Sequence, residues 1–201
     1  MMTRTDVINA SIDANGYRSY LEIGVRDPNA NFAKIKAIHK TAVDPNMRVP
    51  SEDYQLTSYH KVASDEFFAR AEGKWDLIFL DGDHSEAQSK RDLLNSLKHL
   101  STGGTIVMHD CFPMTAEEAL PEKPNNGMAW CGEVYRVFSY ARTRKDLIAC
   151  CINCDHGCGI IKRGREGLRV TFKAEYGYGI FVRQAARWLG IVDPIHLEKV
   201  L

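Results

Sequence analysis

The segment that decides the fold is residues 75–85, which read WDLIFLDGDHS. Residues 75–80 form an almost unbroken apolar run, as expected of a strand that is buried on both faces of a parallel sheet. Asp81-Gly82-Asp83-His84 ends that strand, and Ser85 with Gln88 forms the S-x-x-Q pattern of a helix-capping box. Leucines at 93, 94, 97 and 100 then line one face of a helix. A buried strand followed at once by an amphipathic helix indicates an α/β fold.

Strand and helix signals alternate on both sides of this segment. Further strands are expected at residues 19–23, 41–43, 58–62, 105–108, 147–152 and 159–162. The last two form a hairpin around an Asn/Asp/Gly turn, so one strand near an edge should run antiparallel. Helices are expected from Asp27-Pro28 through Phe32, Ile35 and Ile38, over 65–71 with Ser64 as cap, and from Val134 to Ala141.

These elements predict a Rossmann-like three-layer sandwich with a mostly parallel, seven-stranded sheet. We assign residues 1–163 to this domain and residues 164–201 to a C-terminal extension that packs on it. In the extension we expect a strand at 168–172, a helix at 180–189, and a last short helix capped by Asp193-Pro194.

Composition limits the classes of protein that this chain can belong to. The 201 residues suit one α/β domain with additions, and 26 basic residues balance 26 acidic ones. A binder of nucleic acid or of a membrane surface usually carries a basic excess, so neither partner is expected. No apolar run approaches the roughly 18 residues that would cross a membrane, and the first residues lack a signal-peptide core. We expect a cytoplasmic protein.

Six cysteines are present, and reduced thiols are the expectation for such a chain. Cys151, Cys154, His156 and Cys158 have the residue types of a zinc site, but only one Cys-x-x-Cys pair is present. We favour a hairpin turn without structural zinc.

Two other segments have alternative interpretations. Residues 111–129 form a proline- and glycine-containing connection that is long enough to be a lid or binding loop. The basic run 162–169 could meet the phosphate of a nucleotide- or lipid-linked sugar, although a solvated loop is the favoured interpretation.

Acidic and imidazole side chains gather where the predicted strands end. They are Glu22, Asp44, Asp81, Asp83, His84, His109 and Asp110. Ligands of open parallel sheets bind outside the carboxyl ends of the strands. We therefore expect the functional site at this edge.

Several motifs at this edge resemble one family. They are Glu22-Ile23-Gly24, the segment 80–85, the segment 103–110 (GGTIVMHD), Trp130-x-Gly132-x-Val134-Tyr135, and the segment 157–161. Together they resemble methyltransferase family 24 of the class I S-adenosylmethionine-dependent methyltransferases, over about residues 18–163. The chain departs from that pattern after Gly24, where Val25-Arg26-Asp27 replaces a second glycine.

The resemblance implies roles for individual residues. Glu22 and Gly24 would line the methionine end of the cofactor, Asp44 would hold the ribose, and Ser64 and Asp65 would lie near the adenine. Asp81, His109 and Asp110 would match the metal-ligand positions of metal-dependent relatives, with Asp81 also beside the cofactor. Asp83 or His84 would be the general base.

The implied activity is methyl transfer from S-adenosylmethionine to a hydroxyl of a sugar or other small molecule, as in carbohydrate biosynthesis. A sugar hydroxyl is a weak acid, so Mg²⁺ would help its deprotonation, and His109 as ligand would favour Mn²⁺, Fe²⁺ or Zn²⁺ instead. A non-catalytic cofactor-binding partner protein is the alternative, and the missing glycines disfavour an NAD-dependent oxidoreductase. A homo-oligomer is left open.

Overall fold

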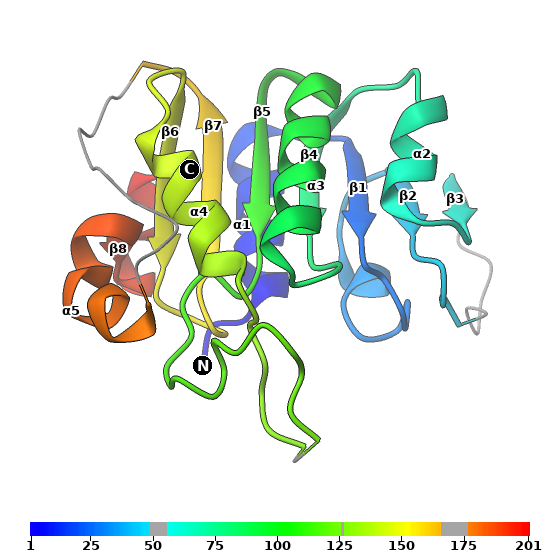
Figure 1. Ribbon diagram of the computed structural model, residues 1–201. Helices are drawn as coiled ribbons and strands as arrows, with labels where there is room; N and C mark the ends of the chain where they lie inside the picture. The colour runs from blue at the N-terminus through cyan, green and yellow to red at the C-terminus, as the bar shows by residue number, and fades with distance from the viewer. Residues whose placement is uncertain (49–55, 126, 166–176) are drawn as a thin grey trace.

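The computed structural model describes residues 1–48, 56–125, 127–165 and 177–201. One eight-stranded sheet forms the middle layer, in the order β3-β2-β1-β4-β5-β7-β6-β8 (Figure 1). Its strands are β1 (Ser19–Ile23), β2 (His39–Val43), β3 (Thr57–His60), β4 (Trp75–Leu80), β5 (Leu100–Met108), β6 (Leu147–Ile152), β7 (Cys158–Arg163) and β8 (Ile191–Val192).

The direction of the strands confirms the predicted α/β class, and the number of strands corrects one detail. β7 runs antiparallel to both β5 and β6, and every other pairing is parallel. The antiparallel strand lies near one edge, as predicted, and β6 and β8 separate it from that edge. The sheet has eight strands instead of seven, since Ile191–Val192 in the C-terminal extension pairs with β6.

Strand alternation gives each face of the sheet its own apolar layer. Ile78 and Leu80 of β4 face the helices α2 (Ser64–Arg70), α3 (Glu86–His99), α4 (Val134–Thr143) and α5 (Tyr178–Leu189). Leu77 and Phe79 face the opposite layer, which contains α1 (Arg4–Asn15) and the short 3₁₀ helices η1 (Phe32–Lys34) and η2 (Pro194–Lys199). This arrangement confirms the three-layer sandwich.

The helix α1 was absent from the sequence prediction. Thr3 and Asp6 form a complete capping box at its start, and Gly16 ends it with a left-handed backbone. Val7 and Ile8 are fully buried on the sheet. The capping pattern at Thr3 and Asp6 is present in the sequence, but no strong apolar periodicity marks the helix that follows it.

The predicted helix from residue 27 to 38 is wrong. Only Phe32–Lys34 forms one short 3₁₀ helix, and Ile38 is 46% exposed. Side chains replace the helical hydrogen bonds here: Nζ of Lys40 donates to the carbonyl oxygens of Phe32 (3.1 Å) and Ile35 (3.4 Å). The connection from β1 to β2 is therefore an irregular loop that packs on the same face of the sheet as α1.

The C-terminal segment packs on the same sheet. β8 extends it, α5 buries Phe181 and Trp188 in the core beside α4, and Asp193 caps η2 through the backbone N–H of Ile195. The strand predicted at 168–172 lies outside the described residues. Within the described parts of the chain, we find no helix with the length and apolarity needed to span a membrane.

Candidate active site

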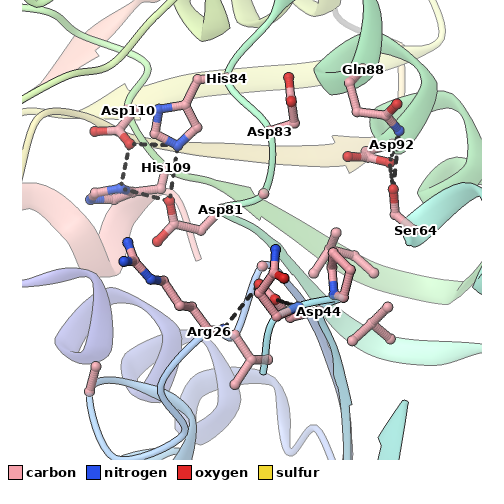
Figure 2. A pocket seen from close by; sticks show the side chains of 18 of the residues that line it. Arg26, Asp44, Ser64, Asp81, Asp83, His84, Gln88, Asp92, His109 and Asp110 are labelled. Carbon is pink, nitrogen blue, oxygen red and sulfur yellow. Dashed lines mark hydrogen bonds and ion pairs between the residues drawn. The ribbon is translucent and has the colours of Figure 1, made fainter. Parts of the chain in front are cut away.

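A cavity of about 870 Å³ opens at the carboxyl ends of the central strands. It lies where the strand order reverses, between β1 and β4, which is the usual ligand position in open α/β sheets. Figure 2 shows many of the side chains that line it. Of the residues predicted from sequence, the cavity is lined by Gly24, Asp44, Ser64, Asp81, Asp83, His84, His109 and Asp110.

Gly24 makes the close approach of β1 and β4 feasible. Its φ is +93°, and a Cβ there would lie 2.0 Å from the carbonyl oxygen of Asp81. No other residue fits this contact without moving the backbone. Gly24 thus lets the β1 loop and the β4 loop form a common floor for the cavity.

Asp44 ends β2 with its carboxylate held by backbone amides. Oδ2 accepts from the N–H of Arg26 (3.1 Å) and Oδ1 from the N–H of Asn46 (2.6 Å) (Figure 2). A carboxylate has about four acceptor positions, so two remain for ligand hydroxyls. The loop after Gly24 therefore orients Asp44 even without a second glycine.

Ser64 is the first residue of α2 rather than its cap, which is Ala63. Its hydroxyl donates to Oδ1 of Asp92 (2.6 Å) and accepts from Nε2 of Gln88 (3.1 Å). Gln88 uses its side chain in this network, so only the Ser85 half of the predicted capping box forms.

Two predicted cofactor residues are not among those that line the cavity. Glu22 is 3% exposed, and its Oε2 accepts from the hydroxyl of Tyr20 (2.5 Å) and from Nδ2 of Asn31 (3.0 Å). Burial raises the pKa of Glu22 to about 7, against the opposing effect of these hydrogen bonds. Asp65 lies on the exposed first turn of α2 and pairs with Arg91 (3.1 Å).

Four side chains at the ends of β4 and β5 form a closed ring of contacts (Figure 2). Nε2 of His84 lies 3.6 Å from Oδ1 of Asp81 and 3.4 Å from Oδ2 of Asp110. Nδ1 of His109 lies 3.4 Å and 3.1 Å from the same two oxygens. The two carboxylates thus converge, as the sequence predicted, because each lies within two residues of the end of one of two neighbouring parallel strands.

Arg4 and Asp155 extend this ring of Asp81, His84, His109 and Asp110. Nη1 of Arg4 lies 3.1 Å from Oδ2 of Asp81, and the backbone N–H of Arg4 donates to Asp155 (3.0 Å). Nε2 of His109 lies 3.5 Å from Oδ1 of Asp155. Arg4 comes from α1 and Asp155 from the β6–β7 turn. Neither residue follows a predicted parallel strand, so the sequence analysis missed both. The capping box at Thr3 was the one sequence signal for α1.

The electrostatics favour charged forms of the ring. Burial lowers the pKa of His109, but Asp81 and Asp110 outweigh it and raise the pKa well above its ordinary value. The pKa of His84 is also raised, because Asp81 and Asp110 again exceed the effect of burial. The pKa of Asp81 is lowered, since His109, His84 and Arg4 together outweigh burial.

His84 is positioned by the segment around Trp130. Its Nδ1 lies 3.1 Å from the carbonyl oxygen of Trp130, and the two rings stack with centroids 4.8 Å apart. A carbonyl only accepts, so Nδ1 carries the proton and Nε2 faces Asp81 and Asp110. Gly132 allows this packing, since a Cβ there would lie 2.6 Å from the Cβ of His84.

Asp83, the other predicted base, differs from His84. Its Oδ1 accepts from the N–H (2.8 Å) and the hydroxyl (2.5 Å) of Ser85 at the start of α3. These bonds lower its pKa. Figure 2 shows its carboxylate pointing away from the ring.

All six cysteines are free thiols. Two groups of described residues bring three ligand atoms within 4.8 Å of one another: Asp81 with His84 and Asp110, and Glu118 with Cys131 and His156. Neither contains Cys151, Cys154 or Cys158, so His156 faces Glu118 rather than the neighbouring thiols.

A sheet with one internal antiparallel strand, and a cavity at the reversal of its strand order, define a class I methyltransferase fold. The family described as a methyltransferase domain, Methyltransf_24, matches residues 10–111. The chain belongs to this family and is an S-adenosylmethionine-dependent methyltransferase. A comparison with curated protein sequences gives no match.

Solved structures show the same fold. A candidate caffeoyl-CoA O-methyltransferase from Staphylococcus aureus has a TM-score of 0.63 at 17% identity, over 82% of this chain and 85% of the other. The Podospora anserina methyltransferase PaMTH1, bound to S-adenosylhomocysteine, gives 0.59 at 14% identity, over 82% and 80%. TomG, an O-methyltransferase of tomaymycin synthesis from Streptomyces achromogenes bound to S-adenosylmethionine, gives 0.56 at 13% identity, over 81% of each chain. At these identities the likeness concerns the fold.

Proposed function

We propose that this enzyme transfers a methyl group from S-adenosylmethionine to a hydroxyl of a small molecule, with His84 as the general base. The observation that carries the proposal is the ring of Asp81, His84, His109 and Asp110, which faces the same cavity as Gly24 and Asp44. The names of two structural relatives, O-methyltransferases, also support oxygen as the acceptor atom.

The cofactor would occupy the β1–β2 side of the cavity. Asp44 would accept hydrogen bonds from the ribose hydroxyls, Ser64 would lie near the adenine, and the methionine end would approach Gly24. Arg26 and Asp27 also line the cavity on that side. The acceptor would then lie on the β4–β5 side, beside His84.

The chemistry follows from this placement. The acceptor oxygen attacks the methyl carbon, the carbon–sulfur bond breaks, and S-adenosylhomocysteine leaves with the bonding electron pair. The hydroxyl proton passes to Nε2 of His84 in the neutral form of that imidazole. Because the pKa of His84 is raised, the neutral form grows only as pH rises above the ordinary histidine range, so turnover should increase with pH there. Asp81 and Asp110 stabilise the imidazolium that results, because both lie within 3.6 Å of that nitrogen.

A sugar is the acceptor class that we propose. Trp130 lines the cavity and stacks on His84, so it presents a flat apolar surface beside the base. Carbohydrates combine such a C–H face with hydroxyls, and the charged ring offers partners for those hydroxyls. A carbohydrate-modifying role in the cytoplasm is the setting that we propose.

The same ring is the place where the predicted metal ion would bind. Asp81, His84 and Asp110 have the donor types of a divalent-ion site and lie close enough for one. An ion would offset the repulsion between the two converging carboxylates. Here His109 already lies between Asp81 and Asp110, and Arg4 pairs with Asp81, so positive charge is supplied without an ion. We propose that transfer proceeds without a metal, and that an added ion competes with these two cations.

The test uses purified protein, radiolabelled S-adenosylmethionine and a panel of free and nucleotide-linked sugars, with and without chelator. We expect transfer to at least one sugar in excess chelator. His84→Ala should lose at least about 100-fold in turnover, typical for a general base, while its affinity for S-adenosylhomocysteine stays unchanged. Asp83→Asn distinguishes the two candidate bases. Full turnover in His84→Ala with loss in Asp83→Asn would move the base to Asp83, and activity abolished by chelator would restore the metal.

A further inference from the structure

A second cluster of ligand-type side chains lies beside the ring but takes no part in the proposed transfer. Glu118 and Cys131 belong to the loop that follows β5, and His156 belongs to the β6–β7 turn. Oε2 of Glu118 lies 3.4 Å from Nδ1 of His156 and 3.9 Å from Sγ of Cys131. All three ligand atoms lie within 4.8 Å of one another.

Backbone hydrogen bonds fix the two loop residues. The N–H groups of Cys131 and Gly132 both donate to the carbonyl oxygen of Glu118 (2.9 Å each). The N–H of Met114 donates to the Glu118 carboxylate (2.8 Å). Glu118 is 8% exposed and Cys131 is fully buried. Backbone hydrogen bonds thus hold the carboxylate and the thiol close together, and both residues are buried.

The turn brings His156 to this loop. The N–H of Phe112 donates to the carbonyl oxygen of His156 (2.8 Å), and the N–H of Cys111 donates to that of Gly157 (3.0 Å). Gly157 is needed for this approach, because a Cβ there would lie 2.6 Å from the Cβ of Phe112. His156 itself has a φ of +58°, an uncommon conformation for a residue with a side chain. The strained turn directs its ring toward Glu118.

The hydrogen bonding of this cluster is incomplete. Nδ1 of His156 is buried and has no hydrogen-bond partner among the described residues. A carboxylate oxygen of Glu118 lies 3.4 Å away, and that oxygen already accepts from the N–H of Met114. Buried polar atoms are normally paired, so an orphaned imidazole nitrogen beside a carboxylate and a thiol needs an explanation.

The donor set suits one class of ion. Thiolate, imidazole and carboxylate together are the ligands of Zn²⁺, whereas Mg²⁺ prefers oxygen alone. Bonds of about 2.0–2.3 Å in a tetrahedron place ligand atoms roughly 3.3–3.6 Å apart. The observed 3.4 Å and 3.9 Å are close to that spacing. Small side-chain movements would therefore complete three corners of the tetrahedron.

We propose that Glu118, Cys131 and His156 form a binding site for a Zn²⁺-class ion. Binding releases the thiol proton of Cys131 to solvent and leaves the fourth coordination position to water, as in other three-ligand zinc sites. The ion would join the loop after β5 to the β6–β7 turn, next to the cavity that His156 also lines. This site adjoins the ring of Asp81, His84, His109 and Asp110, because the Cys131 thiol also contacts the Asp110 carboxylate. It shares no ligand with that ring, and it does not depend on the methyl acceptor.

The test is Co²⁺ and Zn²⁺ binding by the full chain after its metals have been removed with chelator. Co²⁺ bound by a thiolate gives a sulfur-to-metal charge-transfer band in the near ultraviolet, and Zn²⁺ should then displace it with a stoichiometry of one. We expect Cys131→Ser to lose the band. Glu118→Gln and His156→Asn should weaken Zn²⁺ binding by at least about 100-fold, more than is typical for loss of an outer-shell partner. Asparagine is chosen at 156 because it tolerates the left-handed backbone.

Two control variants separate this site from its neighbours. Cys154→Ser changes a thiol of the same turn, and Asp81→Asn changes the ring; both should keep the band and the Zn²⁺ affinity. Circular dichroism of each variant checks that it folds. If Cys131→Ser does not fold, His156→Asn becomes the decisive variant. The proposal is overturned if the wild-type chain gives no band, if the band survives in Cys131→Ser, or if folded His156→Asn keeps the wild-type Zn²⁺ affinity.

Discussion

At the scale of single residues, Asp44 has the most direct consequence for cofactor binding. Two backbone N–H groups hold its carboxylate at the cavity, so the remaining lone pairs are oriented before a ligand arrives. We expect Asp44→Ala to weaken S-adenosylhomocysteine binding by about 1–3 kcal/mol, because ribose hydroxyls would lose a charged acceptor. Isothermal calorimetry measures this. Asp65→Ala is the matched control, since its carboxylate faces Arg91 outside the cavity. Equal affinity in wild type and a folded Asp44→Ala would contradict the placement.

Glu22 should affect stability more than ligand binding. Its pKa is raised from 4.5 to about 7, mainly by burial. A group with a raised pKa contributes stability below its unfolded pKa and loses it as pH rises through the folded pKa. Glu22→Gln removes the buried charge, so it should stabilise the protein at pH 8 by at most about 3 kcal/mol and have little effect at pH 4.5. Urea unfolding measures the free energy of unfolding of both proteins at pH 4.5 and pH 8. If Glu22→Gln changed it equally at the two pH values, Glu22 would not titrate in this range.

The residues at the strand ends show how much of the site can be predicted from the sequence. Carboxyl ends of parallel strands meet at one sheet edge, so the convergence of Asp81 and Asp110 was predictable from the ends of β4 and β5. Side chains alternate along a strand, however, and Glu22 faces the α1 layer while its neighbour Ile23 lines the cavity. A motif match gives the position of a residue in the chain but does not give the face toward which it points.

At the scale of elements, α1 connects the N-terminal region to the site. Arg4, the first residue of the helix, places its guanidinium 3.1 Å from Asp81 and thereby opposes a second cation there. We expect Arg4→Ala to raise the affinity of the ring for Mn²⁺ by at least about tenfold, which corresponds to roughly 1.4 kcal/mol. Electron paramagnetic resonance measures the free ion. Lys36→Ala removes an exposed cation that pairs with Asp13 and is the control. Mn²⁺ binding that is as tight in wild type as in Arg4→Ala would show that Arg4 does not compete with the ion.

Prediction of the elements succeeded where an apolar run alone defines a strand. The boundaries of β4 and β6 match those expected, because such runs need no partner to be recognised by their residues. Those of β1 match as well, because Gly24 ends that strand. The prediction failed at residues 27–38, where the side chain of Lys40 hydrogen-bonds carbonyl groups that would be paired within a helix. It also failed at β8, whose two residues form a strand only because β6 lies beside them. Such contacts are set by tertiary structure, so no local pattern contains them.

At the scale of the whole molecule, the cluster around the ring joins four distant parts of the chain through charge. Arg4 from α1, Asp81 after β4, His109 after β5 and Asp155 in the β6–β7 turn contact one another. With both imidazoles of the ring protonated, three positive groups (Arg4, His84, His109) face three carboxylates (Asp81, Asp110, Asp155). The tertiary structure at this edge should therefore depend on pH from both sides.

The direction of each effect follows from the pKa values. The pKa values of Asp81 and Asp155 are lowered from 3.8, so their stabilisation is present above that pH and is lost as pH falls below it. The pKa of His109 is raised above 6.5, so its stabilisation is present below pH 6.5 and is lost as pH rises through the raised value. The free energy of unfolding should then be greatest between about pH 4 and 6.5. Asp155→Asn keeps the left-handed backbone that residue 155 requires, and it should lower stability at pH 5.5 and make the acid side of the profile shallower. Urea unfolding across pH 2.5–9 measures both curves. Parallel curves for the two proteins on the acid side would mean that the Asp155 carboxylate contributes nothing to holding the turn against α1.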